Sequence, residues 1–238
     1  MIVVVGLPAY TDEDGERCAG GLAVEIAAEA TRRGSRVELA GKVGSDGPGD
    51  SVVVALGRMG VGHAALLRDP ARPTPLLTND TPDADTADAT VGEVAAADAA
   101  AAGVPGSELG ASADHGRLLP DDPNLRPALE AGDVEMALRY LTGPNVVVVA
   151  EGLAPSALAA AVQGAAFSEA KLVVLAEPGA TSLAGIPDAA TVLEKPLADD
   201  GSFARLVGAF AASLDAGADP AKAFRDGVAA SGWEPSAD

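Results

Sequence analysis

The sequence lacks most of the residues that mark a disulfide framework, a metal site or a membrane segment. It contains one cysteine, Cys18, and two histidines in 238 residues. One thiol cannot form an internal disulfide, and no CxxC pair is present to bind zinc. The apolar stretches are shorter than the roughly 20 residues that span a bilayer, and the opening residues MIVVVG lack the charged region of a signal peptide. We therefore expect a cytoplasmic protein with no metal site and no membrane partner.

Aromatic and basic residues are also scarce. Aromatic residues make up 3% of the chain although 48% of it is hydrophobic, so alanine and valine must build the core, and its layers must approach closely. The 35 acidic residues outnumber the 16 basic ones, which gives a net charge of −19. A nucleic-acid-binding protein needs a basic surface, and an anionic membrane would repel this chain. Nucleic acid and membrane are therefore excluded as partners.

The basic residues are themselves unevenly distributed, because twelve are arginine and four are lysine. An acid-rich, lysine-poor and alanine-rich composition fits a cytoplasm of very high salt, where charge repulsion is screened. We interpret the chain as a halophile's protein. The alternative is an ordinary acidic cytosolic protein, and neither interpretation bears on function.

Strand-like and helix-like segments alternate along the chain. Residues 2–5, IVVV, form an apolar run typical of a strand that is covered on both faces. The predicted strands lie at 2–5, 37–44, 60–66, 145–152, 171–179 and 188–196, and the predicted helices at 21–33, 49–59, 133–141, 154–170, 201–217 and 219–233. This alternation predicts one α/β domain over residues 1–238, with a mainly parallel sheet between two helix layers.

The middle of the chain, about residues 68–132, has no clear period. It mixes proline, aspartate, threonine and alanine. TPLLTN at 74–79 and ATVGEV at 89–94 fit a pair of strands, and the region fits a surface loop equally well. We expect this part to be irregular.

A glycine pair, an alanine-rich helix and a glycine-rich loop follow one another in the order of a known family. Gly20 and Gly21 open the helix, and VELAGKVGSDGPGD at 37–50 contains the pattern G-x-V-G-x-D-x-x-G. Over residues 19–62 this order resembles the first signature of the ribokinase-like (PfkB) carbohydrate kinases. The last predicted strands and helices are similar to the C-terminal part of that family.

The resemblance implies a ribokinase-like three-layer α/β/α sandwich with a small β-lid over a sugar. It also implies ATP-dependent phosphorylation of a sugar or nucleoside hydroxyl, with ATP and Mg²⁺ as cofactors if the protein is active. The substrate would lie at Gly20 and Gly21. Asp12, in the turn before the pair, and Glu25, nearest to the family's sugar-binding asparagine, are the other candidate substrate-binding residues.

The motif that performs the chemistry in this family departs from its pattern here. Its G-A-G-D sequence corresponds to Ala198, Asp199, Asp200 and Gly201, so a glycine occupies the position of the catalytic aspartate. Asp200 is the only candidate base, and it lies one residue out of register, which is about 100° around a helix. Asp199 and Asp200 would also repel the phosphate that the family's glycines bind.

Two further departures concern the lid and the metal motif. Between the first strand and Gly20 the chain has only LPAYTDEDGERCA, in which TDEDGE at 11–16 predicts a polar turn, so we expect the lid to be reduced or missing. The dimer that the family forms through its lid should then be absent, which leaves a monomer or a dimer through another surface. EKPLA at 194–198 retains no asparagine of the magnesium-associated N-x-x-E motif.

These observations leave two hypotheses for function. The first is a sugar-kinase homologue whose phosphorylating activity is weakened or lost. The alternative is a non-catalytic protein on the same scaffold that binds a small polar ligand or regulates a partner. Glu151 and Glu177 follow predicted strands at the carboxyl edge of the sheet, where α/β proteins usually bind ligands.

The glycine-rich loop is interpreted as structural. Its glycines shape the connection between a strand and a helix, and Asp46 is expected to cap that helix or to stabilise the turn. The loop glycines are Gly41, Gly44, Gly47 and Gly49.

Overall fold

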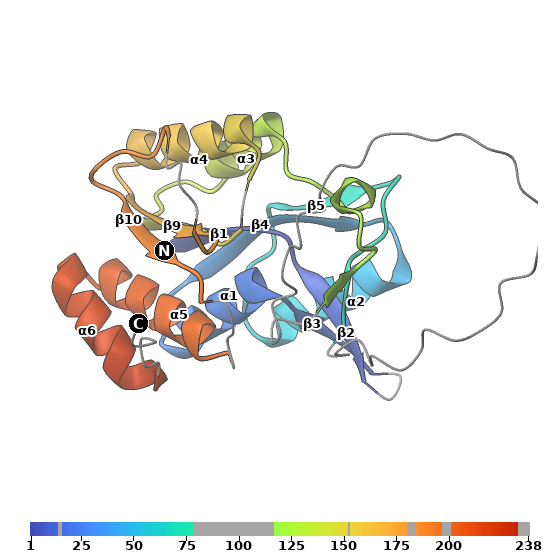
Figure 1. Ribbon diagram of the computed structural model, residues 1–238, viewed down its shortest axis with the longest axis horizontal. Coiled ribbons are helices and arrows are strands. Elements are labelled where there is room, and N and C mark those ends of the chain that lie inside the picture. Colours follow the sequence, from blue (N-terminus) through green and yellow to red (C-terminus); the bar gives the residue numbers. More distant parts are fainter. Residues whose placement is uncertain (14–15, 79–116, 152, 180–183, 197–200, 233–238) are drawn as a thin grey trace, which may run out of the picture.

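The structure is a computed structural model that describes residues 1–13, 16–78, 117–151, 153–179, 184–196 and 201–232. Within these residues, six parallel strands form a central sheet and four strands form a smaller one (Figure 1). The central sheet has the order β10-β9-β8-β1-β4-β5. Its strands are β1 (Ile2–Val5), β4 (Val37–Gly44), β5 (Leu66–Asp69), β8 (Val146–Val149), β9 (Lys171–Ala176) and β10 (Thr191–Glu194).

Helices cover both faces of the central sheet, as predicted (Figure 1). On one face lie α1, α5 and α6, which share one apolar cluster with the sheet, and on the other face lie α3 and α4, which share the second. The helices are α1 (Leu22–Arg32), α2 (Gly47–Arg58), α3 (Ala131–Tyr140), α4 (Pro155–Phe167), α5 (Ser202–Asp215) and α6 (Pro220–Ser231). The predicted α/β sandwich with a parallel sheet is therefore confirmed.

The strands at the centre of the sheet are apolar on both faces because both faces are covered. All four residues of β1 and of β8 are buried, and Ile2 lies in register with Val146. Valine suits this position since its branched side chain packs well on a pleated surface.

Neighbouring helices of the same layer approach each other closely where one of them presents a glycine. A Cβ on Gly208 of α5 would lie 2.6 Å from the Cβ of Glu29 on α1, and a Cβ on Gly164 of α4 would lie 2.4 Å from Leu138 of α3. The Glu29 carboxylate is buried at this crossing and forms ion pairs of 2.6 Å with Arg32 and Arg33 of its own helix. Such close packing agrees with a core that contains few aromatic side chains.

The second sheet is mixed and has the order β3-β2-β6-β7. Its strands are β2 (Ala9–Glu13), β3 (Glu16–Gly20), β6 (Leu76–Thr78) and β7 (Arg117–Leu119). It lies where the resemblance places the lid, which is therefore small and not missing. The segment predicted as a polar turn at 11–16 belongs to a hairpin in which Thr11 pairs with Cys18.

Other predicted elements differ from the structure in detail. The strand predicted at 60–66 lies at 66–69, because residue 62 makes only an isolated bridge to Glu38. In the region expected to be irregular, the structure contains β6, β7 and the 3₁₀ helix η1 (Pro123–Leu125). The strand considered at 89–94 lies outside the described residues. No helix in the described part of the chain has the length and apolarity to cross a membrane.

Candidate functional site

The glycine-rich loop between β4 and α2 is organised by Asp46. One carboxylate oxygen accepts hydrogen bonds from the Gly49 amide (2.8 Å) and the Thr74 hydroxyl (2.6 Å), and the other accepts one from the Thr74 amide (2.8 Å). Burial raises the pKa of Asp46, but these hydrogen bonds outweigh it and hold the pKa below its usual value. Asp46 is thus the N-cap of α2 and also ties the loop to the segment before β6.

The glycines of this loop are surrounded by the chain itself. A Cβ on Gly49 would lie 2.4 Å from the Gly44 carbonyl oxygen, and a Cβ on Gly44 would lie 2.6 Å from the Thr74 amide nitrogen. The space beside Gly44 and Gly49 is therefore filled by the chain's own backbone. The geometry supports the structural interpretation of the loop.

The glycine pair has a different environment. Gly21 precedes α1 with φ +93° and ψ 156°, a conformation that is essentially restricted to glycine. A Cβ on Gly21 would lie 3.6 Å from the nearest atoms, which include the Leu7 carbonyl oxygen, and one on Gly20 would lie 3.3 Å from the Thr11 methyl group. Dihedral angle, and not crowding, requires glycine at residue 21.

Glu151 lies close to this pair, just beyond β8. Its carboxylate accepts a hydrogen bond from the Leu7 amide, and the Leu7 carbonyl is the group that faces Gly21. Burial raises the pKa of Glu151 to about 7, although the Lys195 charge and the Leu7 hydrogen bond favour ionisation. A carboxyl group that is partly protonated at neutral pH therefore lies at the carboxyl edge of the sheet.

Glu177 and Lys195, which follow β9 and β10, complete this edge. They form an ion pair in which Lys195 is largely buried. The negative charge of Glu177 adds to the rise in the Glu151 pKa, and the positive charge of Lys195 opposes it. The structure thus brings together the two carboxylates selected from the sequence, and it adds a lysine that the sequence did not indicate.

Two further cations at this edge were missed from the sequence. The Arg126 guanidinium donates to the carbonyl oxygens of Leu118 (2.8 Å) and Pro120 (2.6 Å), and its charge acts on Glu151. Lys42 of β4 forms an ion pair of 2.5 Å with Asp133 at the start of α3. The ion pair of Lys42 and Asp133 joins residues 91 positions apart, and Arg126 acts on Glu151 from another segment, so no local pattern could have shown these two relationships.

The start of α5 faces the first turn of α1. Gly201 precedes α5 with φ +82°, and a Cβ there would lie 3.9 Å from a carboxylate oxygen of Glu25. Glu25 and Gly201 line a hollow of about 250 Å³ together with Arg32 and Arg205. The other predicted phosphate-loop residues, Ala198, Asp199 and Asp200, lie outside the described residues.

Asp12 is the candidate that the structure leaves furthest from this arrangement. It lies in β2, is half exposed and forms an ion pair of 3.6 Å with Arg17 on the paired strand. Neighbouring strand residues face opposite sides, so Asp12 and Thr11, which contacts Gly20, belong to different faces of the small sheet. A role of Asp12 in binding stays a prediction.

Of the four residues that correspond to the family's catalytic motif, the structure describes only Gly201. No three or more His, Cys, Asp or Glu side chains in the described part gather into a possible metal site. At the start of α5, residue 201 has no side chain to accept a proton, and its nearest titratable neighbour is Glu25. No step of phosphoryl transfer can therefore be assigned to these residues.

Comparison with known proteins shows similarity of structure but not of sequence. No protein-family model and no curated protein sequence matches the chain. A carbohydrate kinase from Agrobacterium tumefaciens aligns over 97% of this chain and 89% of its own, with a TM-score of 0.61 and 15% identity. Ribokinase from Arabidopsis thaliana, solved with ribose and ATP, aligns over 97% and 90%, with a TM-score of 0.59 and 13% identity.

A sugar kinase from Pyrococcus horikoshii aligns over 74% of this chain with a TM-score of 0.48 and 13% identity, and this chain spans about half, 52%, of its length. At identities this low, structural likeness establishes the fold and nothing further. The ribokinase-like fold expected from the resemblance is confirmed over nearly the whole chain by the Agrobacterium and Arabidopsis proteins.

Proposed function

We propose that this chain binds a small polyhydroxylated ligand, a sugar or a nucleoside, between the glycine pair and the carboxyl edge of the central sheet. The observation that carries the proposal is that Leu7 lies between the two: its amide donates to the Glu151 carboxylate, and its carbonyl oxygen lies 3.6 Å from the position of a Cβ on Gly21. A half-buried carboxyl group beside a glycine turn offers hydrogen-bond acceptors to hydroxyl groups at a place where backbone can approach closely.

The scaffold supports a sugar as the ligand class, since the two aligned proteins are a carbohydrate kinase and a ribokinase that binds ribose. The inherited activity is ATP-dependent phosphorylation of a sugar or nucleoside hydroxyl. In this chain that activity is weakened or lost, because Gly201 supplies no base at the start of α5 and Glu25 places negative charge beside it.

The absence of a side chain at Gly201 also favours a second candidate function. In this function the protein binds the ligand without turnover and acts as a sensor or regulator. Binding needs the glycine pair and the carboxylates, whereas turnover also needs a base and a site for the nucleotide phosphates. In either case residues 1–238 act as one unit in a cytoplasm of high salt, consistent with the net charge of −19.

Ligand binding is tested by the melting temperature in multimolar KCl with a panel of sugars and nucleosides. Stabilisation by at least one of them, lost in Glu151→Gln and retained in Asp226→Asn, is the expected result. Asp226 is a matched control because it is an exposed carboxylate on α6. No stabilisation by any ligand of the panel would contradict the proposal.

Catalysis is tested separately by ADP release from ATP and Mg²⁺ with the same ligands. We expect little or no turnover, and a gain in Gly201→Asp that is absent in Gly201→Asn. Aspartate and asparagine both tolerate the positive φ of residue 201, so the two variants differ only in the base. Rapid turnover by the unmodified chain would show that another group accepts the proton.

A further inference from the structure

The outer face of α3 is an exposed surface that the proposed function does not use. We define it by Gly132, Glu135, Met136, Arg139 and Tyr140, all of them exposed, which line a hollow of about 380 Å³. Met136 is 54% and Tyr140 71% exposed, and both lie on this one face. The opposite side of α3 is buried against the rest of the molecule.

The apolar residues of this face are graded in size. Gly132, Met136 and Tyr140 are spaced by four residues, so they form a row with steps of about 6 Å along the helix. The row runs from no side chain, through a flexible one, to a large ring. Nothing lies within 4 Å of the position that a Cβ on Gly132 would occupy, so this end of the row is open.

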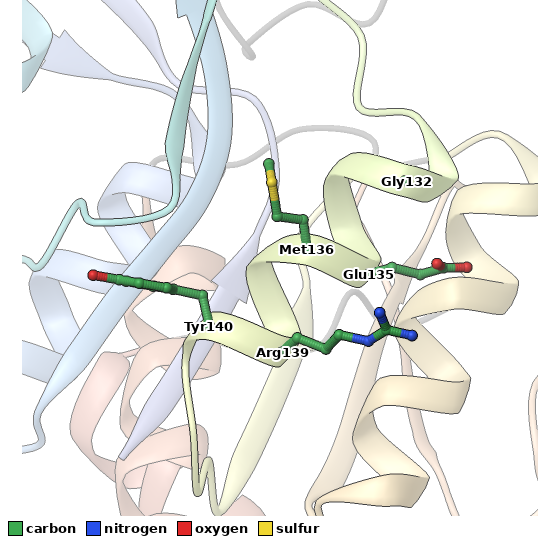
Figure 2. Close-up of a pocket in the computed structure, with 5 residues that line it drawn as sticks. All are labelled: Gly132, Glu135, Met136, Arg139 and Tyr140. Atoms are coloured by element: carbon green, nitrogen blue, oxygen red, sulfur yellow. The ribbon is translucent and has the colours of Figure 1, made fainter.

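The charged residues of this face form a second row beside the first. Figure 2 shows Glu135 and Arg139 extending to one side of α3, and Met136 and Tyr140 extending to the other. Within the described part of the chain, neither Glu135 nor Arg139 takes part in an ion pair. The two ends of the first row therefore differ in the size of the side chain, and the two ends of the second row differ in charge.

We propose that the α3 outer face pairs with the same face of a second copy of this chain. In a two-fold pair whose axis is perpendicular to α3, the helices run antiparallel, so the small end of one row meets the large end of the other. Tyr140 of each copy then lies over Gly132 of its partner, with the two Met136 side chains near the axis. The same arrangement brings Glu135 of each copy towards Arg139 of the other.

This pairing satisfies both rows at once, which is the argument for a second copy over an unrelated partner. Five residues a side are fewer than the 20 to 30 of a typical stable interface, and two chains of charge −19 repel each other. The dimer is therefore weak and concentration-dependent, and added salt strengthens it by screening the repulsion.

The first test is sedimentation equilibrium over a range of protein concentrations and of KCl from about 0.2 to about 2 M. We expect a reversible monomer–dimer equilibrium that Gly132→Leu and Tyr140→Ala each weaken about tenfold or more. Phe167→Ala is the matched control, because this side chain is 91% exposed at the end of α4, outside the defined face. Circular dichroism verifies that the variants fold.

The second test exchanges the charges. Glu135→Arg and Arg139→Glu should each weaken self-association, because each places like charges opposite each other in the pair. Mixing the two variants should restore association, since every contact then joins opposite charges. A monomer at all concentrations, or a dimer that these substitutions do not affect, would overturn the proposal.

Discussion

The glycines in the turn between β4 and α2 differ in their surroundings from the glycines that precede α1 and α5. In the turn between β4 and α2, Gly44 and Gly49 are crowded by backbone atoms at 2.6 and 2.4 Å from a hypothetical Cβ. Gly21 before α1 and Gly201 before α5 have positive φ angles. The atoms nearest to a hypothetical Cβ on each are 3.6 and 3.9 Å from it. The first turn needs glycine because the chain leaves no room for a side chain, and the second pair needs it because of the backbone angle.

This difference in surroundings indicates that a ligand has more space beside Gly21 and Gly201 than beside Gly44 and Gly49. Glycine that is enclosed by its own chain contributes to folding, so its replacement should affect stability before anything else. A glycine of positive φ beside open space leaves the N-terminus of the helix free of side-chain atoms. Its replacement should therefore affect both stability and binding. Substitutions in the two regions can separate these effects.

The largest effect is expected for Gly49→Ala. The added methyl group would lie 2.4 Å from the Gly44 carbonyl oxygen, so the backbone must shift, at a cost of about 3 kcal/mol. Urea denaturation measures the loss. Gly47→Ala is the control in the same helix, because a Cβ there meets only the end of the Arg17 side chain at 3.7 Å. Equal losses in the two variants would contradict the crowding argument.

Glu151 should make stability depend on pH in the neutral range. Its folded pKa of about 7 lies above the usual 4.5, so the folded state binds more protons, and stability falls as pH rises from about 4.5 to about 7. Glu151→Gln removes this dependence and should be roughly 2 to 3 kcal/mol more stable than the unmodified chain at pH 8. Parallel curves for the two proteins from about pH 5 to about pH 8 would argue against the raised pKa.

Gly21→Ala should cost about 2 kcal/mol, because alanine does not readily adopt φ +93° with ψ 156°. It should also reduce the melting-temperature shift produced by the ligand, which Gly49→Ala leaves intact in the folded fraction. Thermal unfolding with and without ligand measures both quantities. An unchanged ligand shift would move the binding site away from the glycine pair.

The smallest effect is expected for Asp46→Ala, at about 1 to 2 kcal/mol for the lost cap and the bonds to Thr74. Since the folded pKa is depressed below 3.8, this stabilisation is present above that value and is lost as pH falls through the folded pKa. Chemical denaturation at neutral and acidic pH follows the difference. Asp50→Ala, at an exposed ion pair with Arg68, should change stability by less.

The parts of the fold that could be predicted from sequence depend on local patterns. The valine run of β1, the spacing of apolar residues in α1 and Pro155 at the first turn of α4 indicate their elements without knowledge of the rest of the chain. The small sheet was underestimated because Tyr10 of β2 pairs with Leu76, far along the chain, and its own strands are short and polar.

Only those residues of the candidate site could be predicted whose position at the end of a strand identifies them. Glu151 and Glu177 follow buried strands, so the carboxyl-edge rule identified them. The role of Leu7 could not be foreseen, because its contribution comes from backbone groups that every residue carries. The ion pair of Lys42 and Asp133 joins residues 91 positions apart and depends on how α3 packs beside β4.

The crossing of α1 and α5 links the core to the candidate site. Gly208 lies two turns along α5 from Gly201, and Glu29 lies one turn along α1 from Glu25, so both helices lead from this crossing to the hollow. A methyl group on Gly208 would clash with Glu29, and we expect it to push α1 and α5 apart at this crossing and at their N-terminal ends. The width of the hollow between Glu25 and Gly201 therefore depends on a contact in the core, at a distance from the residues that line it.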